Sequence, residues 1–305
     1  MYLTVSGQTY EYGNVTKELL ELKTCPIDTE ANAMITYKSG TRVNEFFKER
    51  GFVTNFVEKK QIKIFTNEAK NLGTVNFFYY SPKNSSGVKL SGIKGTTYTL
   101  ENNKIVKTKL SDENIFEEQV NNYIKKVSIA IPKIVNGCVF EYEYSKSSNY
   151  ISNIEDWEVQ EEMPVLYNEF ITELPENFVF QTNLIGPIVP VSDDQRNEFR
   201  NVYLCINGKN CISNFNFIIR KLKFENIPAF KPEPYTASKK DGQGIITNQL
   251  TNINFPGGSY KEFATSYKQF TDKLLDDSRF GKIIQNGDFI KKMISLDPSA
   301  SKFDI

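Results

Sequence analysis

Alternating apolar and polar residues form short segments along most of the chain, with turn residues between them. These segments are rich in Val, Ile, Phe, Tyr and Thr and cover residues 31–40, 59–69, 72–82, 95–110, 125–137, 138–145, 164–175 and 214–228. Alternation with a period of two is typical of strands that bury one face. The pattern therefore predicts a mainly β fold, a large antiparallel β-sandwich that could contain two packed sheet systems, with a helical extension at the C-terminal end.

Only the last fifth of the sequence shows a helical period. Ser259 precedes Glu262 by three residues, which is a capping-box pattern, and Phe263, Tyr267, Phe270 and Leu274 then recur on one face. This predicts an amphipathic helix from Ser259 to about Asp277 that docks on the β region. Residues 186–200 and 228–244 are the best loop candidates, because they are rich in Pro, Gly and charge. We expect a β-rich domain over 1–258, with a possible internal boundary near 186–200, and a helical connector over 259–305.

Residues 139–144 show the alternation most clearly. Phe140, Tyr142 and Tyr144 fall on one strand face, and Glu141 and Glu143 fall on the other. Two carboxylates ~7 Å apart along a strand could act as an acid and base pair. A solvated strand face with the aromatic residues inside is the favoured interpretation.

A second acidic stretch, residues 154–164, surrounds the single tryptophan, Trp157. It could be imagined as a calcium site, but it lacks the regular spacing of an EF-hand loop. We expect exposed carboxylates around a packed Trp157, namely Glu155, Asp156, Glu158, Glu161 and Glu162.

The composition limits the chemistry. The sequence of 305 residues has no histidine, which excludes Ser-His-Asp and Cys-His catalysis and most zinc sites. The 37 basic and 37 acidic residues cancel, so no net field favours nucleic acid, and no apolar run reaches the ~20 residues of a membrane span. We expect no enzyme activity from these residues and assign no catalytic, cofactor-binding or metal-binding residue. An autonomous carboxylate-based hydrolase is the least favoured alternative.

The four cysteines divide into two kinds. Cys25 and Cys138 are isolated, which predicts small buried residues rather than nucleophiles. Cys205 and Cys211 flank the turn signal Asn207-Gly208, which predicts that they lie on neighbouring strands of one hairpin. A disulfide between these two and a pair of free thiols both stay open.

Several stretches in order resemble a bacterial domain of unknown function that lies N-terminal to transglutaminase-like cores. These stretches are "YGNVTKELLELKTCPIDTEANAMITYKSG", "IPKIVNGCVFEYEYS", "EDWEVQEEMPVLYNEFITELPENFVF", "IPAF" with Glu233, and "GSYKEFATSYKQFTDKLLDDSRFG". The resemblance spans nearly the whole sequence. One departure is Tyr267, where the family pattern has tryptophan, and it keeps an aromatic residue at that position.

The resemblance implies the noncatalytic region of a larger protein whose core uses a Cys-His-Asp constellation. Such proteins are exported to the periplasm or held at the cell envelope, so a leader would have been removed before Met1; if Met1 is the natural start, a cytoplasmic location is preferred. The expected partners are a transglutaminase-like core of the same polypeptide and an envelope protein or peptide.

Two functional classes stay open. One is an accessory domain that positions a polypeptide substrate, and the other is a structural interaction module of the cell envelope. An exposed patch that includes Tyr79, Tyr80, Tyr150 or Trp157 would favour the first, and burial of all four would favour the second.

Overall fold

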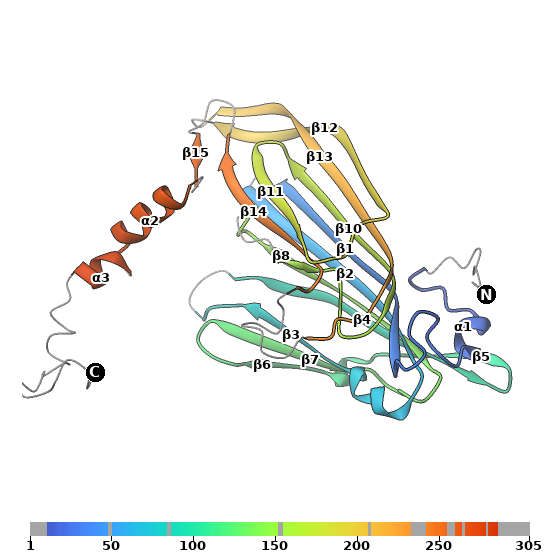
Figure 1. Cartoon of the computed structure of the whole chain (residues 1–305). Coiled ribbons are helices and arrows are strands. Elements are labelled where there is room, and N and C mark those ends of the chain that lie inside the picture. The colour runs from blue at the N-terminus through green and yellow to red at the C-terminus, as the bar shows by residue number, and fades with distance from the viewer. Residues whose placement is uncertain are drawn as a thin grey trace, which may run out of the picture. The chain divides into compact units, whose positions relative to one another are not determined.

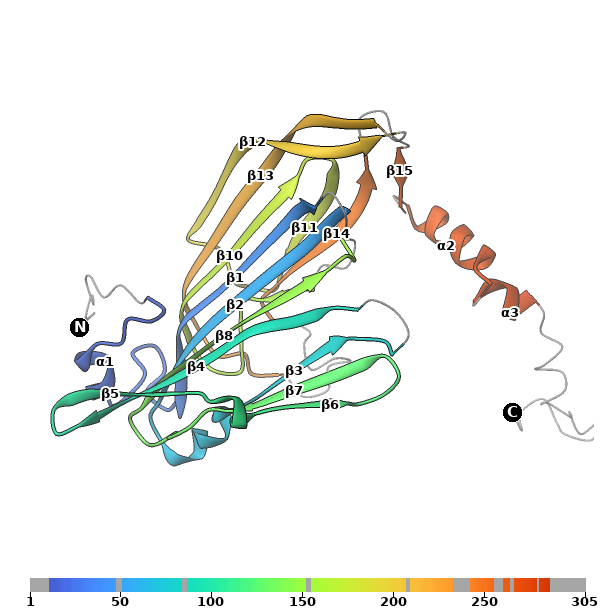
Figure 2. The same ribbon diagram turned by 180° about the vertical axis from the view of Figure 1, so that it is seen from behind.

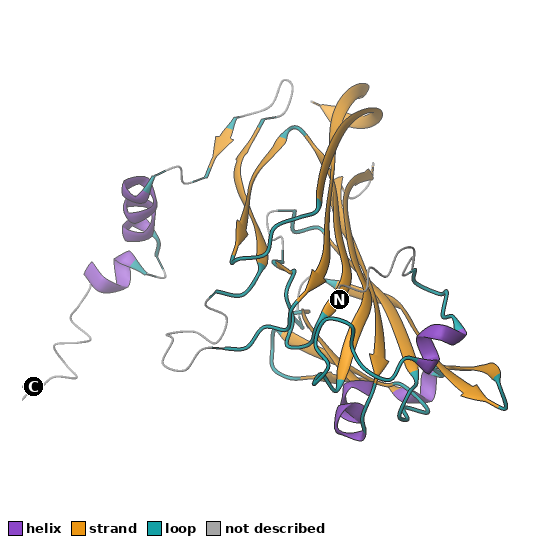
Figure 3. Cartoon of the chain, turned by 45° about the vertical axis from the view of Figure 1, so that its right-hand side comes forward, coloured by secondary structure: helices purple, strands orange, loops and turns teal. Residues whose placement is uncertain are grey.

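The computed structural model describes residues 11–47, 51–83, 87–151, 155–206, 209–232, 242–254, 260–263, 266–278 and 280–285. The protein divides into two compact units, Met1–Gln249 and Leu250–Ile305. Strands dominate the first unit, and the described helices are short (Figure 3). The expected mainly β class is confirmed.

An eight-stranded sheet is the centre of the first unit (Figure 1). Its strands, in spatial order, are β12 (Ser192–Ile206), β13 (Lys209–Ile227), β10 (Val165–Pro175), β1 (Ala33–Phe47), β2 (Gly51–Ile64), β8 (Val139–Ser148), β4 (Lys89–Glu101) and β5 (Lys104–Lys109). All neighbours are antiparallel except β1 and β10, which run parallel with Lys38 opposite Asn168. The expectation of a wholly antiparallel arrangement is therefore wrong for this pair. Strands β1 and β10 are far apart in sequence, so no hairpin signal could indicate their direction.

Two smaller sheets accompany the large one. A three-stranded sheet has the order β3 (Thr74–Tyr80), β7 (Ile124–Ala130), β6 (Ile115–Gln119), and it lies alongside β4 and β8 (Figure 2). A four-stranded sheet has the order β11 (Phe178–Ile185), β14 (Ile245–Ile253), β15 (Lys261–Glu262), and β9 (Trp157–Glu158) also pairs with β14. Two 3-10 helices, Asn67–Gly73 and Asp112–Asn114, connect strands.

The main hydrophobic core joins one face of the large sheet to the smaller sheets. Phe140, Tyr142 and Tyr144 on β8 are buried in this core. The ring of Phe77 on β3 lies 4.4 Å from that of Tyr144 and 6.0 Å from that of Tyr142. The predicted burial of the aromatic face of β8 between sheets is confirmed.

A short helix, α1 (Lys17–Glu21), packs against the opposite face of the large sheet. Its Leu19 and Leu20 belong to a second core cluster with Met34, Val139 and Leu166. The expectation that only the last fifth of the sequence is helical is wrong here. A helix of five residues shows no period, and it is stabilised by packing and by the Thr16 side chain, which accepts a hydrogen bond from the Leu19 N–H.

A β-bulge in β1 decides which residues face the core. The pairing with β2 shifts by one residue between Ile35 and Tyr37. Before the bulge, the odd-numbered Ile35 belongs to the main core, whereas beyond it the even-numbered Lys38 and Arg42 are on that side of the sheet. A bulge adds one residue to one strand, so it reverses the inward and outward alternation beyond it.

The loop expected at 186–200 is wrong from Ser192 onward. Residues 192–206 form β12, which pairs with β13 up to the contact of Ile206 with Lys209. β12 is an edge strand, and its 193–197 stretch is exposed, so it lacks the alternation of a half-buried strand. In the other predicted loop, residues 233–241 lie outside the described residues.

The second unit contains β15, α2 (Tyr267–Asp276) and α3 (Gly281–Gln285). The predicted helix start at Ser259 is wrong, because Lys261–Glu262 is a strand and the N-cap of α2 is Ser266, whose hydroxyl accepts from the Gln269 N–H. Ser266 and Gln269 have capping-box spacing themselves. The predicted end near Asp277 is confirmed. Docking of this helix on the β region stays a prediction. Among the described residues, no helix has the length and apolar character needed to cross a membrane.

Candidate functional site

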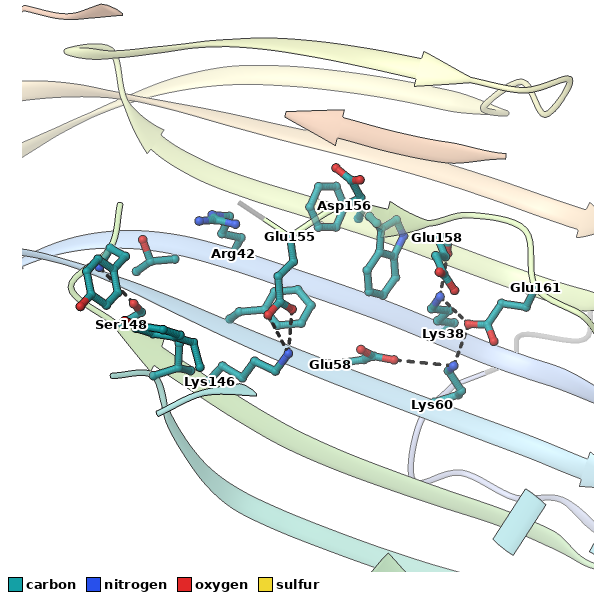
Figure 4. A pocket seen from close by; sticks show the side chains of 17 residues that line it. Lys38, Arg42, Glu58, Lys60, Lys146, Ser148, Glu155, Asp156, Glu158 and Glu161 are labelled. Carbon is teal, nitrogen blue, oxygen red and sulfur yellow. Dashed lines mark hydrogen bonds and ion pairs between the residues drawn. The ribbon is translucent and has the colours of Figure 1, made fainter. Parts of the chain in front are cut away.

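A pocket of about 220 Å³ lies on the core side of the large sheet within the first unit. Strands β1, β2 and β8 form its floor, and the segment around Trp157 forms one wall (Figure 4). The inward face of β2 is otherwise apolar, but Glu58 and Lys60 lie on it at the pocket. The alternation of the strand therefore places two charged side chains in the interior.

Trp157 is the largest apolar element of the pocket. Its ring stacks on Phe170 with centroids 5.2 Å apart and meets Phe56 edge-on at 6.1 Å. Its Nε1–H donates to Asn168 Oδ1 over 2.9 Å, so its single polar group is satisfied. The predicted burial of Trp157 is confirmed, since only 3% of the residue is exposed.

Gly40 on β1 allows this ring to lie close to the backbone. A Cβ atom at Gly40 would stand 2.7 Å from Cζ3 of Trp157. Any larger residue at this position would displace the indole, so the missing Cβ is what permits the close approach.

Three charged side chains form an inner ion cluster at one end of the pocket: Lys38, Lys60 and Glu161. One oxygen of Glu161 lies 2.5 Å from Lys38 Nζ and 2.7 Å from Lys60 Nζ. Lys38 Nζ also donates to the Glu158 carbonyl over 2.6 Å and lies 4.2 Å from the centroid of the Trp157 ring. Figure 4 shows the three side chains converging from two strands and the facing segment.

Within this cluster the charges of the lysines and of the glutamate compensate one another. Burial alone would raise the pKa of Glu161, but the charges of Lys38 and Lys60 outweigh it and hold that pKa at about 2. Burial would lower the pKa of Lys60, yet the charge of Glu161 raises it well above its ordinary value. Glu161 and Lys60 are therefore ionised near neutral pH, and neither is poised to exchange protons there.

Glu58 extends the network along β2. It accepts a hydrogen bond from the Tyr144 hydroxyl over 2.6 Å and lies 3.7 Å from Lys60 Nζ. Burial, and then the charge of Glu58, raise the pKa of Tyr144 well above its ordinary value. The phenol is therefore a hydrogen-bond donor and not a base.

The mouth of the pocket is aromatic. Tyr80 at the end of β3 and Tyr150 after β8 meet edge-on with ring centroids 5.9 Å apart. They are 39% and 42% exposed, whereas Tyr79 and Trp157 are buried. Two of the four candidate residues, Tyr80 and Tyr150, thus form an exposed aromatic patch, which is the observation that would favour an accessory domain.

Lys146 and Glu155 form an ion pair between this mouth and the inner ion cluster. Lys146 Nζ lies 2.7 Å and 2.9 Å from the two oxygens of Glu155. Arg42 lies near this pair and is 4% exposed (Figure 4). Burial lowers the pKa of Arg42 to about 9, against the opposing effect of the Glu155 charge.

The two carboxylates weighed as an acid and base pair interact with different partners. Glu141 is buried. Its carboxylate oxygens accept hydrogen bonds from the Tyr98 hydroxyl over 2.6 Å, the Gln61 amide over 3.0 Å and the Gly13 N–H over 2.9 Å, so protein groups take the place of water. Glu143 pairs with Lys94 at 2.6 Å. The expected solvated face is wrong for Glu141, whose partners come from segments remote in sequence.

The acidic segment also departs from expectation at two residues. Glu155, Asp156 and Glu162 are exposed as expected, but Glu158 is half-buried and Glu161 points inward to two lysines. In the part of the protein that the structure describes, no three acidic or thiol side chains are grouped to hold a metal ion.

The predicted burial of two cysteines and the predicted hairpin position of the other two are confirmed. Cys25 and Cys138 are buried free thiols, and burial raises the pKa of both. Cys205 and Cys211 lie on the two strands of one hairpin, opposite Asn210 and Leu204 respectively. Their side chains lie outside the described residues, so a bridge stays open.

Lys38, Arg42 and Lys60 were not singled out by the sequence. One signal could have indicated Lys60 and Glu58, because they interrupt the inward face that Ile62 and Ile64 continue. The positions of Lys38 and Arg42 depend on the bulge in β1, and this bulge cannot be recognised from the alternation of apolar and polar residues in the sequence.

A family model described as "Domain of Unknown Function with solved-structure structure (DUF3857)" matches residues 54–203. A bacterial domain of unknown function is thus found in this part of the protein. The match includes the pocket residues of β2 and β8 and the segment around Trp157, whereas Lys38 and Arg42 on β1 precede it. None of the curated proteins matches the sequence.

The solved structures that match this protein include the following two. One is described as "a putative protease from Parabacteroides distasonis ATCC 8503"; it is 15% identical with a TM-score of 0.56, over 86% of this chain and 46% of that one. The sequence therefore spans about half the length of that protein, and the similarity is one of fold. The other, a "putative nutrient binding protein" from Legionella pneumophila, is 8% identical with a TM-score of 0.24, over 84% of this chain and 79% of that one.

Proposed function

We propose that this protein is a noncatalytic accessory domain that holds a polypeptide segment for a transglutaminase-like core, in a protein exported to the bacterial periplasm or cell envelope. The observation that carries the proposal is the pocket with the exposed pair Tyr80 and Tyr150 at its mouth. Exposed aromatic rings beside a cavity are the usual anchors for a peptide side chain. A cavity of about 220 Å³ has room for one such side chain and not for a large cofactor.

Two further observations agree with this proposal. The sequence has no histidine, so an imidazole base for thiol chemistry would have to come from elsewhere. The Parabacteroides distasonis structure continues well beyond the shared fold, since only 46% of it is covered. A protease and a transglutaminase-like core both act on polypeptides, which agrees with a polypeptide ligand.

A purely structural interaction module is the second candidate. The observation in its favour is the apolar surface of α2, where Tyr267 is 94% and Phe270 is 54% exposed. Two of the four candidate aromatic residues, Tyr80 and Tyr150, are exposed, however, which favours the accessory role.

Fluorescence polarisation of labelled, unstructured peptides tests the proposal on the full 305-residue protein. We expect peptides that contain aromatic residues to bind, and Tyr80→Ala combined with Tyr150→Ala to weaken binding about ten-fold or more, equivalent to about 1.4 kcal/mol. Tyr123→Ala is the matched control, because Tyr123 is an exposed tyrosine that does not line the pocket. Absence of peptide binding by the folded wild-type protein would favour the structural module instead.

A further inference from the structure

Strand β3 has one edge with which no described strand pairs. Its neighbour in the sheet order is β7 alone. The carbonyl of Gly73 and the N–H of Ser81 bond to the residues that flank β7, so the odd-numbered residues of β3 are the ones that bond to this neighbour. Backbone groups alternate in direction along an antiparallel strand. The N–H and carbonyl groups of Asn76 and Phe78 therefore point to the unpaired edge.

This edge ends at the mouth of the pocket. The Val88 N–H donates to the Tyr80 carbonyl over 2.7 Å, which shows that the even-numbered Tyr80 also faces this edge. Beyond this bond the chain leaves β3, because β4 pairs with β8 and β5. Tyr80 and Val88 both line the pocket. A strand added along Asn76 and Phe78 would therefore have one end beside the cavity.

β3 lacks the features that usually protect an edge strand from further pairing. Its sequence, TVNFFYY, has no charged residue and no proline, and its register with β7 is unbroken. Asn76 is exposed, and Phe78 is 57% exposed. Charged residues are frequent, in contrast, on β12 and β5, which end the large sheet, and on β6, the opposite edge of the same small sheet. β11 is also uncharged, but none of its residues lines the pocket.

An extended polypeptide matches the chemistry of this edge. Its backbone supplies an acceptor for each outward N–H group and a donor for each outward carbonyl, at the spacing of the strand itself. Its outer side chains would lie beside the Phe78 ring, where aromatic and apolar neighbours are favoured. Lys126, which lies opposite Phe78 on β7, already forms an ion pair with Glu118. This face therefore favours an uncharged segment.

We infer that a polypeptide segment binds to this protein as an added strand on the free edge of β3, with the end nearer Tyr80 reaching the pocket. The inference rests on the proposed function, because it specifies how the polypeptide is held and which class of segment is accepted. The accepted class is an extended, uncharged segment that is recognised through its backbone.

Hydrogen exchange followed by NMR tests the inference on the full 305-residue protein, with the uncharged peptide acetyl-Thr-Val-Phe-Val-Thr-amide as the probe. We expect saturating peptide to slow exchange of the Asn76 and Phe78 amides about five-fold or more. The amides of Glu117 and Gln119 are the internal control. Val120 bonds to the β7 side, so these two residues face the opposite edge of the sheet, and their exchange should not change.

A modified peptide and two variants at one residue separate backbone pairing from side-chain contact. The same peptide N-methylated at every residue keeps its side chains but loses its N–H donors, so it should bind about ten-fold more weakly or worse. Asn76→Pro removes an outward N–H that the ladder with β7 does not use, and it should weaken binding of the unmodified peptide about ten-fold. Asn76→Ala keeps that N–H and should bind like the wild type. If Asn76→Pro fails to fold, the exchange measurement and the methylated peptide decide the question.

The outcomes separate the inference from the proposed function. Peptide binding that depends on Tyr80 and Tyr150 but leaves the Asn76 and Phe78 amides unprotected would overturn strand addition and keep the proposed function. Protection of these amides by peptide, with Tyr80→Ala combined with Tyr150→Ala binding like the wild type, would keep strand addition and remove the aromatic anchor. Protection without peptide, in a protein that sediments as a dimer, would assign the edge to a second copy of the chain and overturn the inference. If no peptide binds, both are wrong.

Discussion

The inner ion cluster is the most constrained group of residues in the pocket. Glu161 has two ammonium partners within 2.7 Å, and its side chain is 14% exposed. Two cations taken out of water need this carboxylate, because a buried ion pair that loses one partner leaves an uncompensated charge. The cluster thus fixes the segment around Trp157 to β1 and β2, and with it the wall of the pocket.

Glu161→Gln should lower the free energy of unfolding at neutral pH by about 3 to 5 kcal/mol. The folded pKa of Glu161 is about 2, below its ordinary 4.5. A depressed pKa stabilises the folded state above pH 4.5, and this contribution is lost as the pH falls toward 2. The difference between wild type and variant should therefore narrow across that range, as urea unfolding at several pH values would show.

Glu118→Gln is the matched control for that measurement. Glu118 lies 2.6 Å from Lys126, but its side chain is 61% exposed, so the change should cost less than about 1 kcal/mol. A Glu161→Gln variant as mildly affected as this control would contradict a structural role for the inner ion cluster.

Gly40→Ala should destabilise the protein by about 1 to 3 kcal/mol, because the new methyl group would overlap the Trp157 ring. Trp157→Ala alone should cost on the order of 3 to 5 kcal/mol. In the Trp157→Ala background the glycine change should cost little, since the overlapping ring is gone. Equal costs of Gly40→Ala in both backgrounds, measured by urea unfolding, would show that the close approach is not what requires glycine.

The sequence predicts single residues well where their environment is set locally. Alternation placed Phe140, Tyr142 and Tyr144 correctly, because neighbouring positions of one strand decide which face is apolar. It failed for Glu141 and Glu161, since the groups that satisfy them lie on segments 43 to 128 residues away. A buried carboxylate and an exposed one look the same until those partners are known.

Secondary-structure elements, too, were predicted correctly where adjacent residues determine them and missed where residues remote in sequence do. The turn signal Asn207-Gly208 correctly predicted a hairpin, because a tight turn is specified by adjacent residues. The bulge in β1 and the parallel pair of β1 and β10 were missed, since both depend on pairing between distant segments. The bulge matters most for the site, because it brings Lys38, Gly40 and Arg42 to the side of Trp157.

Helix α2 allows an element to be tested through its cap. Ser266→Ala removes the acceptor of the Gln269 N–H and should destabilise the helix by about 1 kcal/mol. We expect the amides of residues 267–276 to exchange about five-fold faster in the full-length protein, as hydrogen exchange would measure. Ser278→Ala, which lies beyond the helix, is the control; equal exchange in both variants would argue against a cap at Ser266.

At the scale of the whole first unit, the large sheet is covered differently on its two faces. One face carries the main core and the pocket, and the other packs against α1 around the second core cluster. The pocket lies where the residues of the main core give way to charged ones along β1, β2 and β8. Binding of a ligand in this pocket therefore requires no change in the fold, because the pocket residues already lie on one face of the folded sheet.

The proposed function requires a larger protein to which these 305 residues would contribute. We expect the gene to encode, after Ile305, about 100 to 150 further residues that contain a cysteine, a histidine and an aspartate in that order, the size of one domain. This expectation follows from the resemblance to a domain that lies N-terminal to transglutaminase-like cores, whose thiol needs an imidazole base that residues 1–305 do not contain. A stop codon after Ile305, or a continuation without these three residues, would remove the transglutaminase link and leave the structural module as the better account. With such a core present, Tyr80→Ala combined with Tyr150→Ala should raise KM for polypeptide substrates and leave kcat for a small amide substrate unchanged, because the pocket would supply binding and not chemistry.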